Sequence, residues 1–288
     1  MNKDMKRLLE LYNIASPSGK EKQMTAYIMA ELKKMGVACR KDRAGNIYAV
    51  KGKSATYPCV VAHIDEVHRN ETGNYGAYIV ANEMVVGYDR IRKCQTGIGA
   101  DDKNGIWICL RMLERFKKMK CVFFVGEEVG CVGSNRADMK FFKDCRFVIQ
   151  CDRKGNSDIV TSISGTPLCS DAFIKAIQPE MHGYSESYGM MTDVLTLKQR
   201  GLSVSCVNLS CGYYNPHTDN EITILADLMK CYEFVRHIVK THTGVSEHKY
   251  MRQRRTGIRY SPSIFGFDDS RYLNRRNRIN RDWEETDV

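Results

Sequence analysis

Hydrophobic and polar positions alternate with two periods along the first 240 residues, which predicts helices and strands in alternation. Apolar residues at helical spacing predict helices at residues 3–12, 21–35, 105–118 and 224–240. Apolar runs rich in β-branched residues predict strands at residues 37–41, 46–50, 58–63, 121–125, 147–151 and 204–209, with a hairpin at 77–88. This order favours an α/β fold with a mixed, mostly parallel central sheet covered by helices on both faces.

Three of these strands end at side chains that bind metals. The segments are VVAHIDE with His63 and Asp65, FFVGEE with Glu127 and Glu128, and FVIQCD with Asp152. Two further segments carry the same residue types, GADDKNG with Asp101 and Asp102 and NPHTDNE with His217. An open α/β sheet places its chemistry at the carboxyl ends of its strands, so we expect these side chains to converge.

The number of candidate ligands is sufficient for two zinc ions. Zinc accepts imidazole and carboxylate ligands, and a catalytic site keeps one position for water. A carboxylate that bridges two ions, with about two further ligands on each ion, would leave a shared water with a lowered pKa. A neighbouring carboxylate that binds no metal could then take a proton from this water. The consecutive Glu127 and Glu128 suit this division, because neighbours at a strand end point to different sides.

Each residue also has a simpler interpretation. A single histidine after an apolar run is usually structural, paired glutamates can form a solvated turn, and Asp152 could cap a turn. The ordered set of five segments favours the metal site over these alternatives. For Asp102 and Lys103 the alternative stays open: Asp102 could be the N-cap of a helix that begins near Asn104.

The order H-x-D, D-D-K, E-E, D and H resembles the co-catalytic zinc exopeptidases and amidohydrolases. This group includes peptidase T, the glutamyl and leucyl aminopeptidases and related deacylases. The segments AHIDEV, GADDKNG and GEEVGCVGS carry the resemblance, which covers residues 1 to about 240. It implies a single catalytic domain with the zinc exopeptidase fold.

The resemblance also implies a role for each residue. His63 and Asp152 would hold the first zinc, Glu128 and His217 the second, and Asp101 would bridge them. As catalytic residues, Glu127 would be the general base and Asp65 would orient the His63 ring. Cobalt or manganese could substitute for zinc. The resemblance further implies a cis peptide bond between Asp101 and Asp102.

Substrate contacts are less defined by the sequence. The candidates are His182, in a polar loop containing Gly and Ser, together with Asp193 and Tyr213. The lid or dimerisation domain that some relatives insert between the Asp152 position and the last histidine does not fit in this chain. The resemblance therefore favours an aminopeptidase acting on short peptides over a carboxypeptidase, with an N-acyl amino acid amidohydrolase as the alternative. The oligomeric state stays open.

Composition agrees with a soluble enzyme. The chain has 288 residues, of which 43% are hydrophobic. It contains no apolar run of about 18 residues, the length that would suggest a membrane span. The first thirty residues are too charged for a signal peptide, so we expect a cytoplasmic protein. The twelve cysteines form no C-x-x-C pair and are expected to be reduced. Cys131 and Cys211 lie close to the predicted site, where exposure would allow oxidation or binding of a soft metal.

Residues 241–288 differ from the preceding domain, residues 1–240. They contain ten Lys and Arg against seven acidic residues, with little apolar periodicity. This composition favours a flexible or loosely docked tail. The alternative is an arm that binds nucleic acid through basic and aromatic side chains, on a hydrolase domain that serves only as a scaffold. The tail accounts for three of the ten net positive charges, so the basic character is not a property of the tail.

Overall fold

A nine-stranded sheet runs through the centre of the protein, which the computed structural model describes from residue 3 to residue 249. The strand order is β1-β2-β7-β3-β8-β12-β9-β10, with β11 beside β9. The bounds are β1 (Ala38–Lys41), β2 (Ile47–Lys51), β3 (Tyr57–His63), β7 (Met119–Phe124), β8 (Cys145–Arg153), β9 (Asp158–Ile163), β10 (Thr166–Pro167), β11 (Ser185–Gly189) and β12 (Cys206–Ser210).

The four central strands β7, β3, β8 and β12 are parallel to one another. Antiparallel strands flank them, with β1 and β2 on one side and β9 and β10 on the other, while β11 runs parallel to β9. The mixed α/β sheet predicted from the sequence is therefore confirmed, with its parallel strands in the centre.

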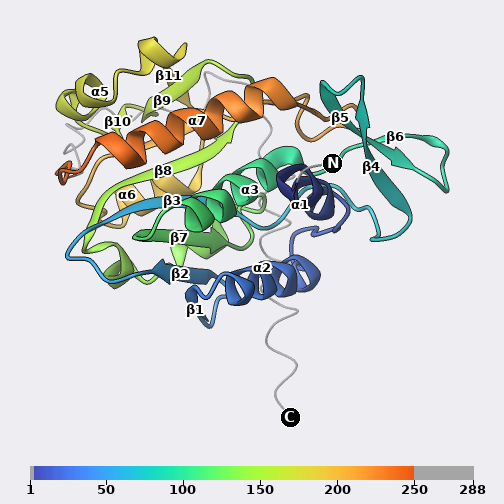
Figure 1. The fold of residues 1–288 in the computed structure, drawn as a ribbon, viewed down its shortest axis with the longest axis horizontal. Helices are drawn as coiled ribbons and strands as arrows, with labels where there is room; N and C mark the ends of the chain where they lie inside the picture. The colour runs from blue at the N-terminus through green and yellow to red at the C-terminus, as the bar shows by residue number, and fades with distance from the viewer. Residues whose placement is uncertain (1–2, 250–288) are drawn as a thin grey trace, which may run out of the picture. The chain divides into compact units, whose positions relative to one another are not determined.

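Helices cover both faces of the sheet (Figure 1). On one face α1, α2, α3 and α7 pack against the strands, while α6 and η1 pack on the other. The bounds are α1 (Lys3–Tyr12), α2 (Lys22–Lys34), α3 (Ala100–Arg115), α4 (Val132–Asn135), η1 (Met139–Phe142), α5 (Asp171–Ile177), η2 (Pro179–His182), α6 (Asp193–Gln199) and α7 (Leu225–Thr241).

The pleat of the strands divides the core between these two faces. Along β3, Val60 and Ala62 pack with the residues of α1, α2, α3 and α7, whereas Cys59 and Val61 pack with those of α6 and η1. Successive side chains of a strand point to opposite faces, so a strand buried on both sides is apolar throughout. This explains the continuous apolar runs in the sequence.

The predicted helices are confirmed with small shifts at their ends. The observed α1 has the predicted bounds, and α2 and α7 differ by one residue at each end. The third helix begins at Ala100 rather than at residue 105, but Asp101 and Asp102 in its first turn have non-helical backbone angles. It ends at Arg115, because Phe116 is extended. The elements from β9 to α6 were not predicted.

A second, smaller sheet is formed by two separate parts of the chain, residues 75–96 and residues 213–224. Its order is β13-β14-β5-β4, with β6 paired to β5. The predicted hairpin is confirmed as β4 (Tyr75–Val80) and β5 (Met84–Asp89), and the remaining strands are β6 (Cys94–Thr96), β13 (Tyr213–Tyr214) and β14 (Ile222–Ile224). The loop with His217 joins β13 to β14, so this sheet fixes both ends of that loop.

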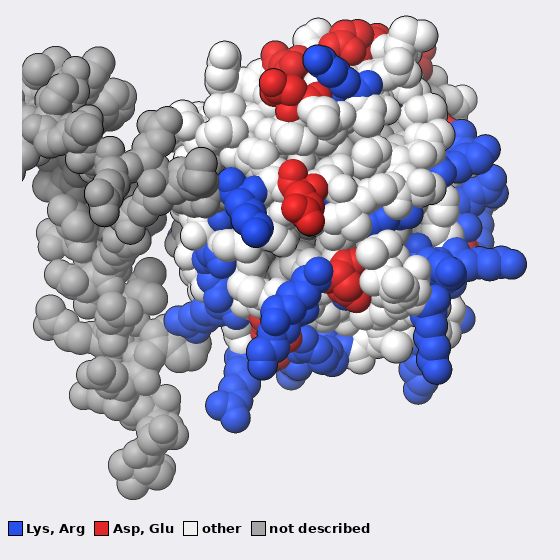
Figure 2. All heavy atoms as spheres, turned by 90° about the vertical axis from the view of Figure 1, so that its left-hand side faces the viewer, with Lys and Arg blue, Asp and Glu red and all other residues white. Residues whose placement is uncertain are grey.

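Positive charge is spread over the described domain. Figure 2 shows many Lys and Arg side chains on one face, with Asp and Glu side chains gathered near the top of the view. This agrees with the prediction that the excess of basic residues is not confined to the C-terminal segment. Within residues 3–249, none of the helices combines the length and apolar character needed to cross a membrane.

The first residues of the predicted tail are part of the domain. Ser246 exchanges backbone hydrogen bonds with the core, donating to Arg146 O at 2.9 Å and accepting from Ser205 N at 2.7 Å. His248 N donates to Ser203 O at 2.8 Å, and His248 O accepts from the buried ammonium of Lys198 at 2.9 Å. The rest of the predicted tail, from residue 250 onward, lies outside the described residues.

A chain that ends after Lys240 should therefore be less stable than one that ends after Lys249. The shorter chain loses about three backbone hydrogen bonds, worth about 1 kcal/mol each, so we expect its Tm to be about 5–10 °C lower. Thermal unfolding followed by circular dichroism measures the difference. Equal Tm values would mean that residues 241–249 contribute nothing to the domain.

Candidate active site

The predicted ligands lie together where the parallel strands end. His63 is the last residue of β3, Asp152 is the last but one of β8, and Glu127 and Glu128 follow β7 after a short turn. The strand β3 pairs with both β7 and β8, which places these ends next to one another. The first turn of α3 brings Asp101 to the same edge.

Asp101 lies between two histidines. Its Oδ1 is 3.0 Å from Nε2 of His63, and its Oδ2 is 3.4 Å from Nε2 of His217. The His63 ring is also 3.6 Å from Oδ1 of Asp152, and the His217 ring is 3.1 Å from Oε2 of Glu128. Each histidine therefore shares Asp101 and has one further carboxylate of its own. The peptide bond between Asp101 and Asp102 is cis, as the resemblance implied.

These separations fit zinc ligands. Two ligands at about 2.0–2.1 Å from one tetrahedral zinc lie about 3.3 Å apart, close to the four distances above. Glu128 also has a buried carboxylate oxygen, Oε1, without a hydrogen-bond partner within the described part of the chain. The imidazole and carboxylate donors are the ones that zinc prefers. The residues present therefore fit two metal ions.

His63, Asp102 and Asp152 form another possible metal-binding group. One ligand atom from each of these residues lies within 4.8 Å of the other two. However, both carboxylate oxygens of Asp102 are already used. Oδ1 accepts from Gly105 N at 3.0 Å, and Oδ2 accepts from His63 N at 3.1 Å. Asp102 thus caps the regular part of α3, which was the simpler of its two interpretations. Asp101 is the better bridging ligand.

Crowded carboxylates give this cluster a strong preference for cations. Burial, together with Asp101, raises the pKa of Asp152 well above its usual value, and burial raises the pKa of Glu128. Hydrogen bonds to Asp101 and Glu128 raise the pKa of His217 to about 10. Although burial opposes it, three carboxylates also raise the pKa of His63. The raised pKa values of the two histidines, and the effect of Asp101 on Asp152, reflect the negative charge of the carboxylates, which divalent cations would neutralise.

Asp65 connects the His63 ring to the glutamate pair. Its carboxylate accepts from Glu127 N at 2.9 Å, from Glu128 N at 3.2 Å and from the Ser18 hydroxyl at 2.7 Å. Its backbone carbonyl lies 2.9 Å from Nδ1 of His63, nearer than its carboxylate at 3.5 Å. A carbonyl can only accept, so Nδ1 carries the proton and Nε2 is free for a metal.

Glu127 has a different environment from Glu128. Burial, with nearby carboxylates, raises the pKa of Glu127 to about 9. Its Oε1 lies 3.5 Å from the thiol of Cys131, whereas Glu128 faces His217. Glu128 is thus a candidate metal ligand, whereas Glu127 is a carboxylate that lies beside the candidate ligands.

The three predicted substrate contacts lie in different places. The Tyr213 hydroxyl is buried and donates to Asp152 Oδ1 at 3.4 Å, so it touches a ligand candidate. Asp193 is fully buried, with Oδ2 3.5 Å from Gln150 Nε2, and burial raises its pKa to about 6; a direct substrate contact does not fit this position. His182 packs its ring on Phe234 and His237 of α7, and the structure does not bring it to the cluster.

Glu221 is a supporting residue that the sequence did not single out. Its buried carboxylate accepts from the backbone amides of Ile98 at 3.0 Å, Gly99 at 2.7 Å and Asp101 at 3.2 Å. His68 Nε2 lies 3.0 Å from the same carboxylate. Glu221 thus fixes the backbone that carries Asp101. Its position four residues after His217, in HTDNE, was the available signal.

Asp152 is held by polar neighbours on the sheet. Gln150 Nε2 donates to Asp152 Oδ2 at 3.0 Å, and the Thr192 hydroxyl donates to Gln150 Oε1 at 2.7 Å. The Asn208 side chain accepts from Asp152 N at 2.9 Å and donates to Asp152 O at 2.8 Å. Both Gln150 and Asn208 were missed: only the pairing of β12 with β8 brings Asn208 to Asp152, whereas Gln150 lies two residues before Asp152 on the same strand, a spacing that predicts the same face.

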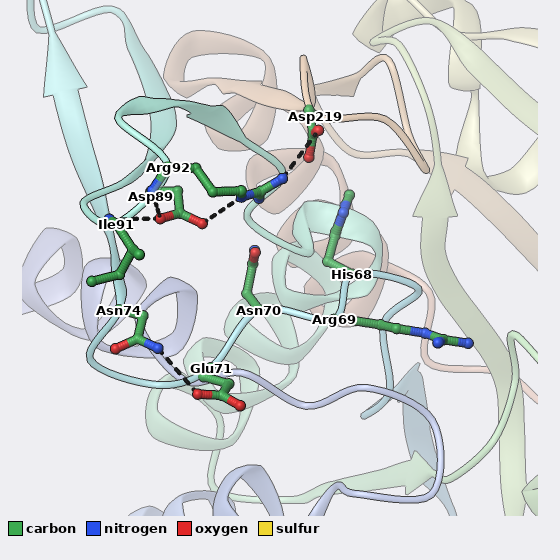
Figure 3. A pocket seen from close by; sticks show the side chains of 9 residues that line it. All are labelled: His68, Arg69, Asn70, Glu71, Asn74, Asp89, Ile91, Arg92 and Asp219. Atoms are coloured by element: carbon green, nitrogen blue, oxygen red, sulfur yellow. Dashed lines mark hydrogen bonds and ion pairs between the residues drawn. The ribbon is translucent and has the colours of Figure 1, made fainter.

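A cavity of about 360 Å³ adjoins the loop with His217 (Figure 3). Asp219 lines it, two residues after His217, and so does His68, which contacts Glu221. Arg92 pairs with Asp89 at 2.7 Å and with Asp219 at 3.7 Å. The cavity is therefore polar and shares its walls with elements that hold the ligands. Its lining comprises His68, Arg69, Asn70, Glu71, Asn74, Asp89, Ile91, Arg92 and Asp219.

No family model and no curated protein matches the sequence. Solved structures show that the fold is that of aminopeptidases. The aminopeptidase PepT from Bacillus cereus has a TM-score of 0.68 at 15% identity, covering 83% of this chain and 97% of that one. A tripeptidase from Staphylococcus aureus has a TM-score of 0.66 at 14% identity, covering 82% and 97%.

An aminopeptidase from the archaeon Desulfurococcus kamchatkensis is also similar, with a TM-score of 0.64 at 13% identity, covering 84% of this chain and 95% of that one. The resemblance inferred from the sequence motifs is thus confirmed at the level of the fold.

Replacing Glu221 by Gln should weaken metal binding. The Glu221 carboxylate accepts hydrogen bonds from backbone N–H groups, whereas a glutamine side chain would direct its own N–H donors at some of them. Loss of such support typically costs about 10–100-fold in metal affinity. Competition with a chromophoric chelator measures the affinity for zinc. The matched control is Glu83→Gln, at an exposed turn between β4 and β5. Equal zinc affinity in both variants would contradict a supporting role for Glu221.

Proposed function

We propose that the protein is a two-zinc aminopeptidase that removes N-terminal residues from short peptides. The main support is the position of Asp101, with one oxygen near His63 and the other near His217. A carboxylate with a histidine on each side is what a bridging ligand requires. The fold of aminopeptidases adds to this support.

In this proposal each zinc has three protein ligands. His63 and Asp152 would hold one ion, Glu128 and His217 would hold the other, and Asp101 would bind both. Bound zinc would supply a Lewis acid and lower the pKa of a bound water toward about 7. Glu127 would accept the proton of the attacking water and return it to the leaving amine. Burial raises the pKa of Glu127 to about 9, and a neighbouring cation would lower this pKa toward the range that a general base needs.

The substrate would lie on the open side of the cluster, where His217 is half exposed. The polar cavity beside Asp219 offers space for a substrate side chain or a following residue. The short connection between Asp152 and His217 favours an aminopeptidase, since relatives that bind a terminal carboxylate usually do so from a lid inserted there. Removal of an acyl group from an amino acid is the alternative within the same chemistry.

A substrate screen with the full chain tests this function. Di- and tripeptides with free N-termini should be hydrolysed after addition of zinc, cobalt or manganese, and a chelator should abolish the activity. The same peptides with acetylated N-termini are the matched controls. Cleavage of only N-acylated substrates would favour the deacylase, and no cleavage of either set would overturn the enzymatic proposal.

Glu127 and Glu128 should respond differently to the same substitution. Glu127→Gln should retain two zinc ions but lower kcat by about 10²–10⁴, the range for lost general-base catalysis. Glu128→Gln should lose zinc as well as activity, because it removes a ligand. Metal analysis and steady-state kinetics measure both effects. Normal turnover in Glu127→Gln would exclude Glu127 as the base.

A further inference from the structure

The thiol of Cys131 lies against the side chain of Glu127. Cys131 Sγ is 3.5 Å from Glu127 Oε1, a distance suited to an S–H donor. The sequence suggested that Cys131 and Cys211 could be exposed, but both are fully buried. Cys131 is therefore not an accessible thiol at which oxidation or binding of a soft metal would be expected.

The backbone fixes the thiol at this place. Cys131 N donates to Glu127 O at 2.8 Å, and the turn continues with Val132 N to Gly126 O at 2.9 Å. Cys131 has a φ of 54°, in the left-handed region that residues other than glycine rarely adopt. The same turn thus carries both the carboxylate and its thiol neighbour. A thiol that only filled an apolar gap would not need this arrangement.

The surroundings of the thiol are polar. Burial raises the pKa of Cys131, and the nearby carboxylates of Asp193 and Glu127 act in the same direction. The Thr196 hydroxyl contacts the sulfur. The group therefore stays protonated and can donate. The other oxygen of Glu127, Oε2, accepts no hydrogen bond from residues 3–249, so the thiol is the one donor that this part of the chain offers to the carboxylate.

We propose that Cys131 is a positioning residue for Glu127: its thiol hydrogen holds Oε1 and leaves Oε2 to exchange the proton. This inference rests on the proposed function, since it assigns Glu127 the role of base. It predicts that the donor at position 131 matters, whereas the sulfur itself does not.

Two variants separate donation from packing. Cys131→Ala removes the donor, whereas Cys131→Ser keeps a donor in a side chain of nearly the same volume as alanine. We expect kcat of the alanine variant to fall about 10-fold, with KM unchanged. The serine variant should restore most of the rate. Zinc content and Tm are measured for each, with Cys169→Ala, away from the site, as the control for losing a core thiol.

A spectroscopic measurement tests the contact independently of turnover. The infrared S–H stretch of Cys131, isolated as the difference between the zinc-loaded native protein and Cys131→Ala, should lie at the position of a hydrogen-bonded thiol. It should move to that of a free thiol in the Glu127→Ala background. A band that does not move, or an alanine variant with native kcat, would overturn the proposal. If the native protein hydrolyses no substrate, the proposed function fails while the S–H band still decides whether the contact exists.

Discussion

The position of one carboxylate between two imidazoles is the constraint on which the site depends. His63 comes from the central sheet and His217 from a loop of the second sheet, so Asp101 can face both only when the two sheets are correctly placed. Glu221 supplies the link, because it flanks β14 and accepts the backbone amides of the segment that leads to Asp101. The small sheet is therefore part of the active-site scaffold and not an appendage.

The same segment is secured by a buried ion pair. Lys103 and Glu66 are both almost fully buried, with 3.0 Å between Nζ and Oε2. Burying two charges is unfavourable unless further hydrogen bonds satisfy them. Here Ile98 O accepts from the ammonium and Ser16 N donates to the carboxylate, at 2.9 and 2.6 Å. This pair is satisfied by the protein alone, whereas Glu128, among the ligand candidates, keeps a buried oxygen without a partner within residues 3–249.

The sequence could predict the strands that end in ligands, because apolar runs followed by His or acidic residues are local signals. It could not predict the role of Asn208, whose polar side chain in β12 meets Asp152 only because β12 pairs with β8. For the same reason His182, in a polar loop, was a poor candidate: its surroundings are set by α7, which is distant in the sequence. The elements from β9 to α6 are short and carry little periodicity, so tertiary contacts decide their structure.

Glu127 and Glu128 illustrate how environment divides identical side chains. Asp65 accepts both backbone amides and so holds the two residues at fixed positions, with one side chain directed to His217 and the other to Cys131. Burial, with nearby carboxylates, raises the pKa of Glu127 to about 9. In the proposed enzyme, a cation beside Glu128 and the thiol donor at Oε1 would both act in the opposite direction. The proposed base would then depend on the balance between burial and these two contacts, so the two glutamates could not exchange their proposed roles.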